Sequence, residues 1–253
     1  MERGAMVEPL ANAVGLCVGN TRTRVGLFRE GRLVESESMP NTERDDIIAW
    51  ARSKGGEVLL SSVNEPAAIT LEEKLHDVHR AGRDFDIPIR TDLHPDATPG
   101  QDRLLCALGA WNRTEQACVV VDAGTAVTVD YVDAEGAFRG GVIAAGLNMS
   151  LRALHEQTSA LPLLRYDASA LPEGPFGRNT AEAMREGARA GIIGLVHLMI
   201  DRYALHAGSY PQVVATGGDA VMLFENDELV EHIVPDLQLM GLWAAWEGAG
   251  GGD

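Results

Sequence analysis

Two short turns in this sequence combine glycine with amide or hydroxyl residues at the end of a predicted strand. Gly19-Asn20-Thr21 follows the apolar run 14–18, and Gly124-Thr125 follows the apolar run 118–122. Glycine lets the backbone approach an anion without a side chain in the way, and successive N–H groups in such a turn form a concave anion site. Two such turns that face each other across a cleft would hold a polyphosphate from both sides.

Two further signals lie at the ends of predicted strands. Asp122 ends the strand before the second turn, where a hard oxygen donor suits a cation or a metal-bound water. The alternative is that this carboxylate caps a hairpin. Thr216-Gly217-Gly218 ends the apolar run 213–216 and leads into a helix, which suits adenosine or phosphate contact at a helix N-terminus. Glycine-rich connections are also common as simple turns, so each signal is weak alone.

The segments around the two turns are similar to each other. When residues 16–23 are placed over residues 121–128, the glycines and the final threonines coincide. Glu30-Gly31 and Glu135-Gly136 then follow at the same spacing. The spacing of 105 residues (16 to 121) is too long for a solenoid repeat and suits two duplicated lobes. A chance likeness of two β-hairpins is the alternative.

Composition restricts the class of protein and its partners. The 253 residues are 45% hydrophobic and 23% charged, as in a globular protein. The formal net charge of -16 disfavours nucleic acid and anionic membrane as partners. Cys17, Cys106 and Cys118 have apolar neighbours and no metal-site spacing, so we expect buried free thiols. Residues 1–12 form a loose leader without the apolar core of a signal peptide, and a cytoplasmic location is expected.

The pattern of apolar residues predicts an α/β protein. We expect strands over 14–18, 24–28, 32–36, 57–63, 118–122 and 213–216, and helices over 45–52, 66–80, 101–112 and 149–157.

The order of the motifs resembles the type III pantothenate kinase family, from about residue 14 to residue 242. The motifs that carry the resemblance are Gly19-Asn20-Thr21-x-Thr23, Gly100-x-Asp102-Arg103, Asp122-x-Gly124-Thr125-Ala126-x-Thr128-x-Asp130, Gly140-Gly141-x-Ile143-x-x-Gly146, Thr158-x-x-Leu161-Pro162, Gly177-Arg178-Asn179-Thr180 and Thr216-Gly217-Gly218. The resemblance implies two ribonuclease-H-like lobes, here 13–117 and 118–248, with a nucleotide cleft between them, as in the acetate and sugar kinase/Hsp70/actin superfamily. It further implies a homodimer that phosphorylates pantothenate from ATP with Mg²⁺ and a monovalent cation such as K⁺.

The resemblance also assigns roles to single residues. Asp102 matches the general base that takes the proton of the pantothenate hydroxyl, although an acid in the first turn of a helix is the alternative interpretation. Asp122 matches the carboxylate near the γ-phosphate and the cations. Residues that match substrate contacts are Gly100, Arg103 and Thr180, the last from the partner subunit, and His94 lies where the family's pocket tyrosine is expected. Residues assigned to ATP are Gly19, Asn20, Thr21, Arg24, Gly124, Thr125, Thr216, Gly217 and Gly218.

Three positions depart from the family pattern. Cys17 stands where the family has a magnesium-positioning Asp, and a thiol is a poor ligand for Mg²⁺. The pocket tyrosine is absent, with Leu93 and His94 in its neighbourhood, and Ala145 replaces a Pro. Three hypotheses therefore remain: a pantothenate kinase weakened by Cys17, an impaired paralogue that binds nucleotide or pantothenate as a regulator, and a kinase for another small alcohol. If position 17 borders a solvated cleft, Cys17→Asp should speed turnover at low magnesium.

Overall fold

The computed structural model describes residues 12–251, so the predicted leader lies outside the described residues apart from Asn12. The chain forms two compact units. Unit 1 takes in the residues up to 89, residues 98–112 and the chain from 236 onward, and unit 2 takes in residues 90–97 and 113–235. The contiguous lobes 13–117 and 118–248 stay a prediction. The contact-defined units differ from them chiefly because the last helix belongs to unit 1.

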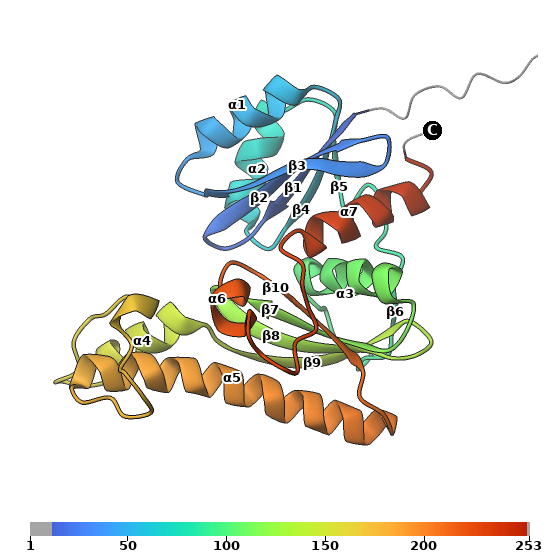
Figure 1. Cartoon of the computed structure of the whole chain (residues 1–253). Helices are drawn as coiled ribbons and strands as arrows, with labels where there is room; N and C mark the ends of the chain where they lie inside the picture. The colour runs from blue at the N-terminus through green and yellow to red at the C-terminus, as the bar shows by residue number, and fades with distance from the viewer. Residues whose placement is uncertain (1–11, 252–253) are drawn as a thin grey trace, which may run out of the picture. The chain divides into compact units, whose positions relative to one another are not determined.

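Unit 1 contains a five-stranded sheet in the order β3-β2-β1-β4-β5 (Figure 1). Its strands are β1 (Ala13–Val18), β2 (Arg22–Arg29), β3 (Arg32–Pro40), β4 (Glu57–Ser62) and β5 (Val78–Arg80), and its helices are α1 (Arg44–Lys54), α2 (Glu65–Lys74), α3 (Gln101–Thr114) and α7 (Leu237–Gly248). The β1–β2 and β2–β3 pairs are antiparallel, and the β1–β4 and β4–β5 pairs are parallel.

Side-chain alternation along β1 supplies two separate cores in unit 1. Val14, Leu16 and Val18 belong to the cluster that includes the buried residues of α1 and α2. Ala13 and Cys17 belong to the cluster that includes α3 and α7. Successive residues of a strand point to opposite faces of the sheet, so each face is covered by its own pair of helices.

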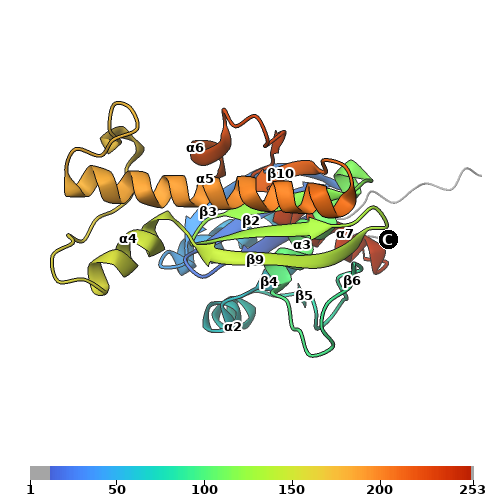
Figure 2. The same ribbon diagram turned by 90° about the horizontal axis from the view of Figure 1, so that it is seen from below.

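Unit 2 contains a six-stranded sheet in the order β11-β10-β7-β8-β9-β6. Its strands are β6 (Arg90–Thr91), β7 (Cys118–Ala123), β8 (Ala126–Val132), β9 (Ala137–Ala145), β10 (Gln212–Thr216) and β11 (His232–Ile233), and its helices are α4 (Leu147–Glu156), the 3₁₀ turn Ala168–Ala170, α5 (Thr180–Ala207) and α6 (Ala220–Phe224). The long helix α5 runs along the sheet, while α4 and the first turns of α5 extend beyond it (Figures 1 and 2).

The two sheets share one topology, which confirms the predicted duplication and the ribonuclease-H-like fold. The order β3-β2-β1-β4-β5 in unit 1 corresponds to β9-β8-β7-β10-β11 in unit 2. The alignment of the two hairpins, however, is wrong by one residue after the turn. Cys17 pairs with Arg24, whereas Asp122 pairs with Thr128. The first turn is one residue longer than the second. The Gly19 N–H donates to the carbonyl of Arg22, three residues on, whereas the Gly124 N–H donates to the carbonyl of Ala126, two residues on.

One predicted helix needs correction. The helix expected over 66–80 ends at Lys74, and residues 78–80 form strand β5. Asp77 has a φ of 53°, which is incompatible with continuing the helix. The sequence analysis also missed α5, whose interior contains Gly187, Gly191 and Gly194. Glycine lowers helix propensity, so the helical signal is diluted along this segment.

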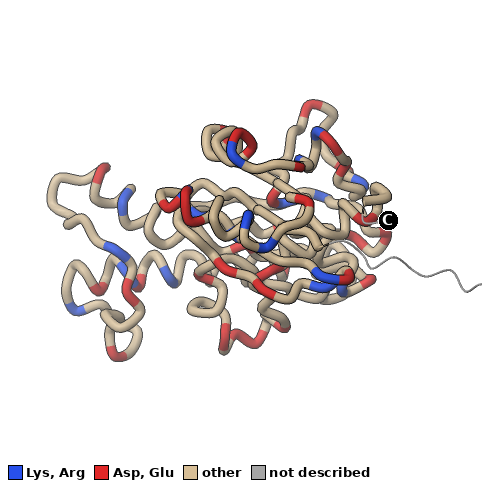
Figure 3. The backbone as a smooth tube through the Cα atoms, turned by 90° about the horizontal axis from the view of Figure 1, so that it is seen from above, with Lys and Arg blue, Asp and Glu red and all other residues tan. Residues whose placement is uncertain are grey.

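The remaining expectations concern the surface and the thiols. Figure 3 shows basic residues dispersed among the acidic ones along the tube. Within residues 12–251, no helix is both long enough and apolar enough to span a membrane. Cys17, Cys106 and Cys118 are buried and free, as predicted.

Candidate functional site

The first phosphate turn is the connection between β1 and β2. Asn20 and Thr21 are exposed there. Asn41, which the sequence analysis missed, braces this turn from the far end of β3. Its Nδ2 donates to the Gly19 carbonyl at 2.8 Å, and its backbone N–H donates to the Thr21 carbonyl at 2.9 Å. The Thr23 hydroxyl donates to Asn41 Oδ1 at 2.8 Å. The turn is thus preorganised by one side chain that is 22 residues from Gly19 in the sequence.

The N-terminus of α3 presents the carboxylate of Asp102. Gln101 fixes this end of the helix, because its Nε2 donates to the Ala81 carbonyl at 2.8 Å. Asp102 is half-buried, and its Oδ1 accepts the backbone N–H of Arg103 at 2.8 Å. A side chain at Gly100 would meet that same oxygen at 2.5 Å, so glycine there leaves room for the carboxylate. Gly100, Asp102 and Arg103 therefore lie together at one helix end.

The Cys17 thiol lies in the core of unit 1, on the face covered by α3 and α7. It is 2% exposed and hydrogen-bonds Ser61, its register partner on β4. Burial raises the pKa of this thiol to about 12, so it stays protonated and is not a ligand for a hard cation at neutral pH. Position 17 therefore belongs to a packed core and does not border a solvated cleft, because side-chain alternation on β1 places Cys17 in the cluster that includes α7.

Arg24 is held by an ion pair that the sequence analysis did not anticipate. Its Nε and Nη2 lie 2.8 Å and 2.6 Å from Oδ1 of Asp236, and Nη2 also donates to the Ser36 hydroxyl at 3.3 Å. Asp236 directly precedes α7 and is 212 residues away in the sequence, so no local pattern could have indicated it. A contact between Arg24 and ATP stays a prediction.

The second group of predicted residues converges at the carboxyl ends of β7 and β10 in unit 2. Thr216 is the register partner of half-buried Asp122. Gly217 follows with a φ of 94°, and a Cβ there would overlap Asp122 Oδ1 and the Ala123 carbonyl. The Asp219 N–H donates to that carbonyl at 2.9 Å. Glycine at position 217 therefore allows the chain to pass close to the Asp122 carboxylate as it turns into α6.

The second phosphate turn is packed against the start of α4. The Gly146 N–H donates to the Thr125 carbonyl at 3.2 Å, and a side chain at Gly146 would overlap the Gly124 carbonyl. Among residues 12–251, no three His, Cys, Asp or Glu side chains gather as a metal-ligating group.

Two predicted substrate contacts lie apart from these strand ends. Thr180 is exposed at the first position of α5. Asn179 caps this helix, accepting the Glu182 N–H at 2.9 Å, and Glu182 accepts the Arg178 N–H at 2.8 Å. Arg178 and Asn179 of the motif 177–180 thus take part in capping the N-terminus of α5. His94 is exposed on the segment before α3, and its Nδ1 lies 3.6 Å from Asp96.

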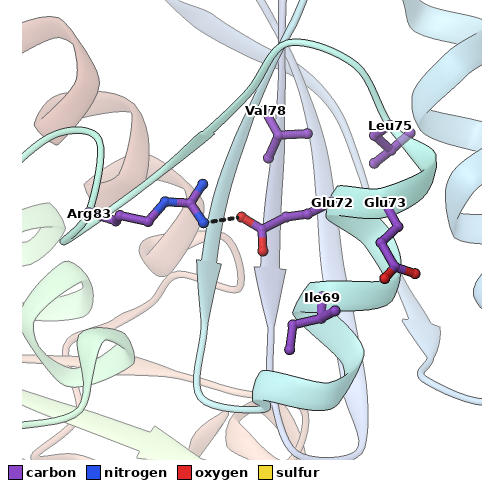
Figure 4. Close-up of a pocket in the computed structure, with 6 residues that line it drawn as sticks. All are labelled: Ile69, Glu72, Glu73, Leu75, Val78 and Arg83. Atoms are coloured by element: carbon purple, nitrogen blue, oxygen red, sulfur yellow. Dashed lines mark ion pairs between the residues drawn. The ribbon is translucent and has the colours of Figure 1, made fainter.

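A surface pocket of unit 1 lies elsewhere, between α2 and β5 (Figure 4). It is lined by Ile69, Glu72, Glu73, Leu75, Val78 and Arg83, and an ion pair of 2.7 Å joins Arg83 to Glu72. None of these residues was assigned to a site.

Two units with one shared ribonuclease-H-like topology define a protein of the acetate and sugar kinase/Hsp70/actin class. Among solved structures, a Campylobacter jejuni protein described as a Baf family transcriptional activator gives a TM-score of 0.61 at 18% identity, covering 93% of this chain and 98% of that one. A Sinorhizobium meliloti protein described as a 2-dehydro-3-deoxygalactonokinase gives 0.53 at 14%, covering 93% and 98%. These likenesses concern the fold alone.

Sequence comparison identifies the family. The family model "Type III pantothenate kinase" matches residues 16–202. The type III pantothenate kinase of Maricaulis maris is 39% identical over 177 residues, which cover 70% of this chain and 66% of that protein. The one of Dehalococcoides mccartyi strain CBDB1 is 32% identical over 262 residues, covering 96% and 97%. The chain belongs to the type III pantothenate kinase family.

The buried position of Cys17 predicts the behaviour of Cys17→Asp. The new carboxylate would be desolvated, and we expect the free energy of unfolding at pH 8 to fall on the order of 3 kcal/mol. Burial raises the folded-state pKa of such an Asp above its unfolded value, so the folded state binds more protons and the loss shrinks as pH falls. Thermal melts at pH 5 and pH 8 measure this, with Cys17→Ser as the hydrogen-bonding control. A variant that melts normally and turns over faster at low magnesium would contradict the burial argument.

Gly217→Ala tests the left-handed turn at Asp122. The methyl group would overlap Asp122 and the Ala123 carbonyl at a φ that alanine rarely adopts. We expect the free energy of unfolding to fall by about 2 kcal/mol or more, measured by denaturant titration. Gly218→Ala is the matched control, because its Cβ would have nothing within 4 Å. Equal stability of the two variants would show that residue 217 does not constrain this turn.

Proposed function

We propose that this chain transfers the γ-phosphate of ATP to the hydroxyl of pantothenate, the first step toward coenzyme A. The observation that carries the proposal is the family match over residues 16–202, which includes Asp102 and the motif around it. The fold alone would not support it, because the same fold serves many functions.

In the proposed reaction, Asp102 accepts the proton of the pantothenate hydroxyl as the oxygen attacks the γ-phosphate. The position of Asp102 in the first turn of α3 supports this role, because Gly100 keeps its carboxylate uncrowded and Gln101 anchors the helix end. Arg103 would contact the substrate, and its guanidinium offers a fixed charge to an anionic acceptor. His94 would line the acceptor pocket.

The phosphate turns would hold ATP through backbone N–H groups and hydroxyls, with Gly19, Asn20 and Thr21 in unit 1 and Gly124 and Thr125 in unit 2. Thr216, Gly217 and Gly218 would lie on the adenosine side. The absence of a side chain at Gly217, where a Cβ would collide with Asp122 Oδ1, supports a cation site at this carboxylate. Mg²⁺ held there would neutralise charge that develops on the phosphoryl group, and K⁺ or another monovalent cation would add to this.

The proposed enzyme is a cytoplasmic homodimer. The enzyme would work as a homodimer in which Thr180 of one subunit completes the pantothenate site of the other. The exposure of Thr180 at the start of α5, beyond the sheet of its own unit, supports this. The net charge of -16 supports a protein without nucleic-acid or anionic-membrane partners, and the place of action would be the cytoplasm.

One observation favours a second function. Cys17 removes a carboxylate from the first phosphate turn, and its thiol is buried and protonated. A paralogue that binds nucleotide or pantothenate as a regulator, without turnover, would tolerate this. The absent pocket tyrosine similarly leaves open a kinase for another small alcohol.

Asp102→Asn tests the proposed base. With wild type, ATP, Mg²⁺ and K⁺, we expect phosphopantothenate to form. In the variant, kcat should fall about 10²- to 10⁴-fold, because general-base catalysis contributes that much, while ATP affinity and melting temperature stay near wild type. Asp45→Asn is the matched control, since Asp45 is likewise an acid in a first helical turn, on α1. A variant that retains more than about a tenth of kcat would exclude Asp102 as the base; a wild type that binds ATP without turnover would favour the regulator.

Subunit complementation tests the shared site. Asp102→Asn and Thr180→Ala chains should each be inactive, and mixing them should restore part of the activity, because a hybrid dimer contains one intact site. Mass spectrometry of differently tagged chains verifies exchange. Proven exchange without recovered activity, or a monomer by light scattering, would contradict the shared site.

A further inference from the structure

The three carbonyl groups of the first phosphate turn are each held by a residue from another part of unit 1. The Gly19 carbonyl accepts Asn41 Nδ2 at 2.8 Å, and the Asn20 carbonyl accepts Asn64 Nδ2 at 3.2 Å. The Thr21 carbonyl accepts the backbone N–H of Asn41 at 2.9 Å. Asn41 directly follows β3 and Asn64 follows β4, and these two strands flank the β1–β2 hairpin in the sheet. The turn is therefore held from both sides.

A carbonyl that is held in place also fixes the N–H group of the same peptide. No described residue has a cis peptide bond, and in a planar trans peptide the C=O and N–H groups point in opposite directions. The Asn20 N–H shares its peptide with the Gly19 carbonyl, so it points away from Asn41 Nδ2. Asn20 is an exposed residue of this turn. The bond from Asn41 therefore determines the direction in which the turn presents a donor to a ligand.

The duplicated turn of unit 2 shows what the side chain of Asn41 adds. Gly146 directly follows β9 as Asn41 directly follows β3, and the N–H of each donates to the last carbonyl of its turn. A Cβ at Gly146 would overlap the Gly124 carbonyl, so the main chain itself packs on that carbonyl in unit 2. In the longer turn of unit 1, the amide of Asn41 reaches the equivalent Gly19 carbonyl. The asparagine thus supplies a contact that unit 2 obtains from backbone packing.

Each of the two asparagines is also fixed by a second hydrogen bond. Asn41 Oδ1 accepts the hydroxyl of the buried Thr23 at 2.8 Å, which leaves the Nδ2 end of the amide facing the turn. Asn64 Oδ1 accepts the Ala67 N–H at 3.3 Å as the N-cap of α2. An amide side chain offers a donor and an acceptor at once. Each asparagine therefore ties the turn to a further element, β2 for Asn41 and α2 for Asn64.

We propose that Asn41 and Asn64 are positioning residues for the nucleotide: they hold two successive peptides of the first phosphate turn and thereby aim the Asn20 N–H at a phosphate oxygen. The proposal rests on the proposed function for the identity of the ligand, ATP. A donor that is already oriented does not have to be ordered when the anion binds, so less of the binding free energy is lost. The asparagines act through the turn and do not themselves contact the nucleotide.

Asn41→Ala and Asn64→Ser test the proposal. Serine keeps a capping oxygen for α2 but lacks the amide donor to the Asn20 carbonyl, so this variant carries the test if Asn41→Ala does not fold. The dissociation constant of MgATP, measured by titration calorimetry, should rise about 3- to 10-fold in each variant, as expected for the loss of one hydrogen bond. KM for ATP should rise with it, while kcat and KM for pantothenate stay near wild type.

Arg52→Met is the matched control. Arg52 Nη2 also donates to a backbone carbonyl of unit 1, that of Lys74 at the end of α2, and neither residue belongs to the turn. We expect this variant to bind MgATP like wild type. Thermal melts accompany every variant. A variant at position 41 or 64 that melts lower and loses kcat, with KM for ATP unchanged, would reveal a merely structural role and overturn the proposal.

A measurement that needs no turnover separates this proposal from the proposed function. The backbone ¹H–¹⁵N signal of Asn20 should shift when MgATP is added to the wild type, and at equal saturation the shift should be smaller in Asn41→Ala. A wild type that shows this shift but phosphorylates no pantothenate would defeat the proposed function alone. The positioning role fails if the Asn20 signal does not move at saturation, if both variants bind MgATP as tightly as wild type, or if the wild type does not bind MgATP.

Discussion

The sheet of unit 1 buries one of its faces against a helix that the chain supplies only after it has built all of unit 2. That helix, α7, has buried residues from Leu237 to Trp246 on all sides, as expected of a helix inside a core. Phe28 stacks on Trp243 with centroids 4.9 Å apart, and Leu239 fills the space above Gly15 and Gly26. Without α7, this face would lose one of its two covering helices, and α3 would lose its packing partner.

Because the two units share one topology, each has equivalent strand ends, but the residues at those ends differ in their chemistry. Asp122 and Cys17 occupy equivalent places on the central strands, yet one is a half-buried carboxylate beside a left-handed glycine and the other a buried thiol bonded to Ser61. The difference arises from what covers each strand end. In unit 1 the residue points at α7, and the charged groups nearby are Arg24 on the next strand and its partner Asp236.

The candidate site could be predicted where a residue's role depends on its own segment. The glycine and hydroxyl turns after β1 and β7, the acid at the start of α3 and the Thr-Gly-Gly turn after β10 were all placed at strand or helix ends from local pattern. Residues that act across long sequence separations could not be found this way. Asn41 braces a turn from another strand, and Asp236 meets Arg24 from 212 residues away.

The sequence by itself determined the α/β class, the duplication and the family, because strand periodicity, glycine turns and motif order are local properties that survive in the linear chain. It could not determine which face of β1 carries residue 17, that residues 78–80 form a strand instead of continuing a helix, or that the last helix returns to unit 1. Those outcomes depend on the packing of segments distant in sequence, where burial of apolar surface outweighs local preference. Tertiary structure alone therefore decided that Cys17 is a core residue and that Arg24 has a carboxylate partner.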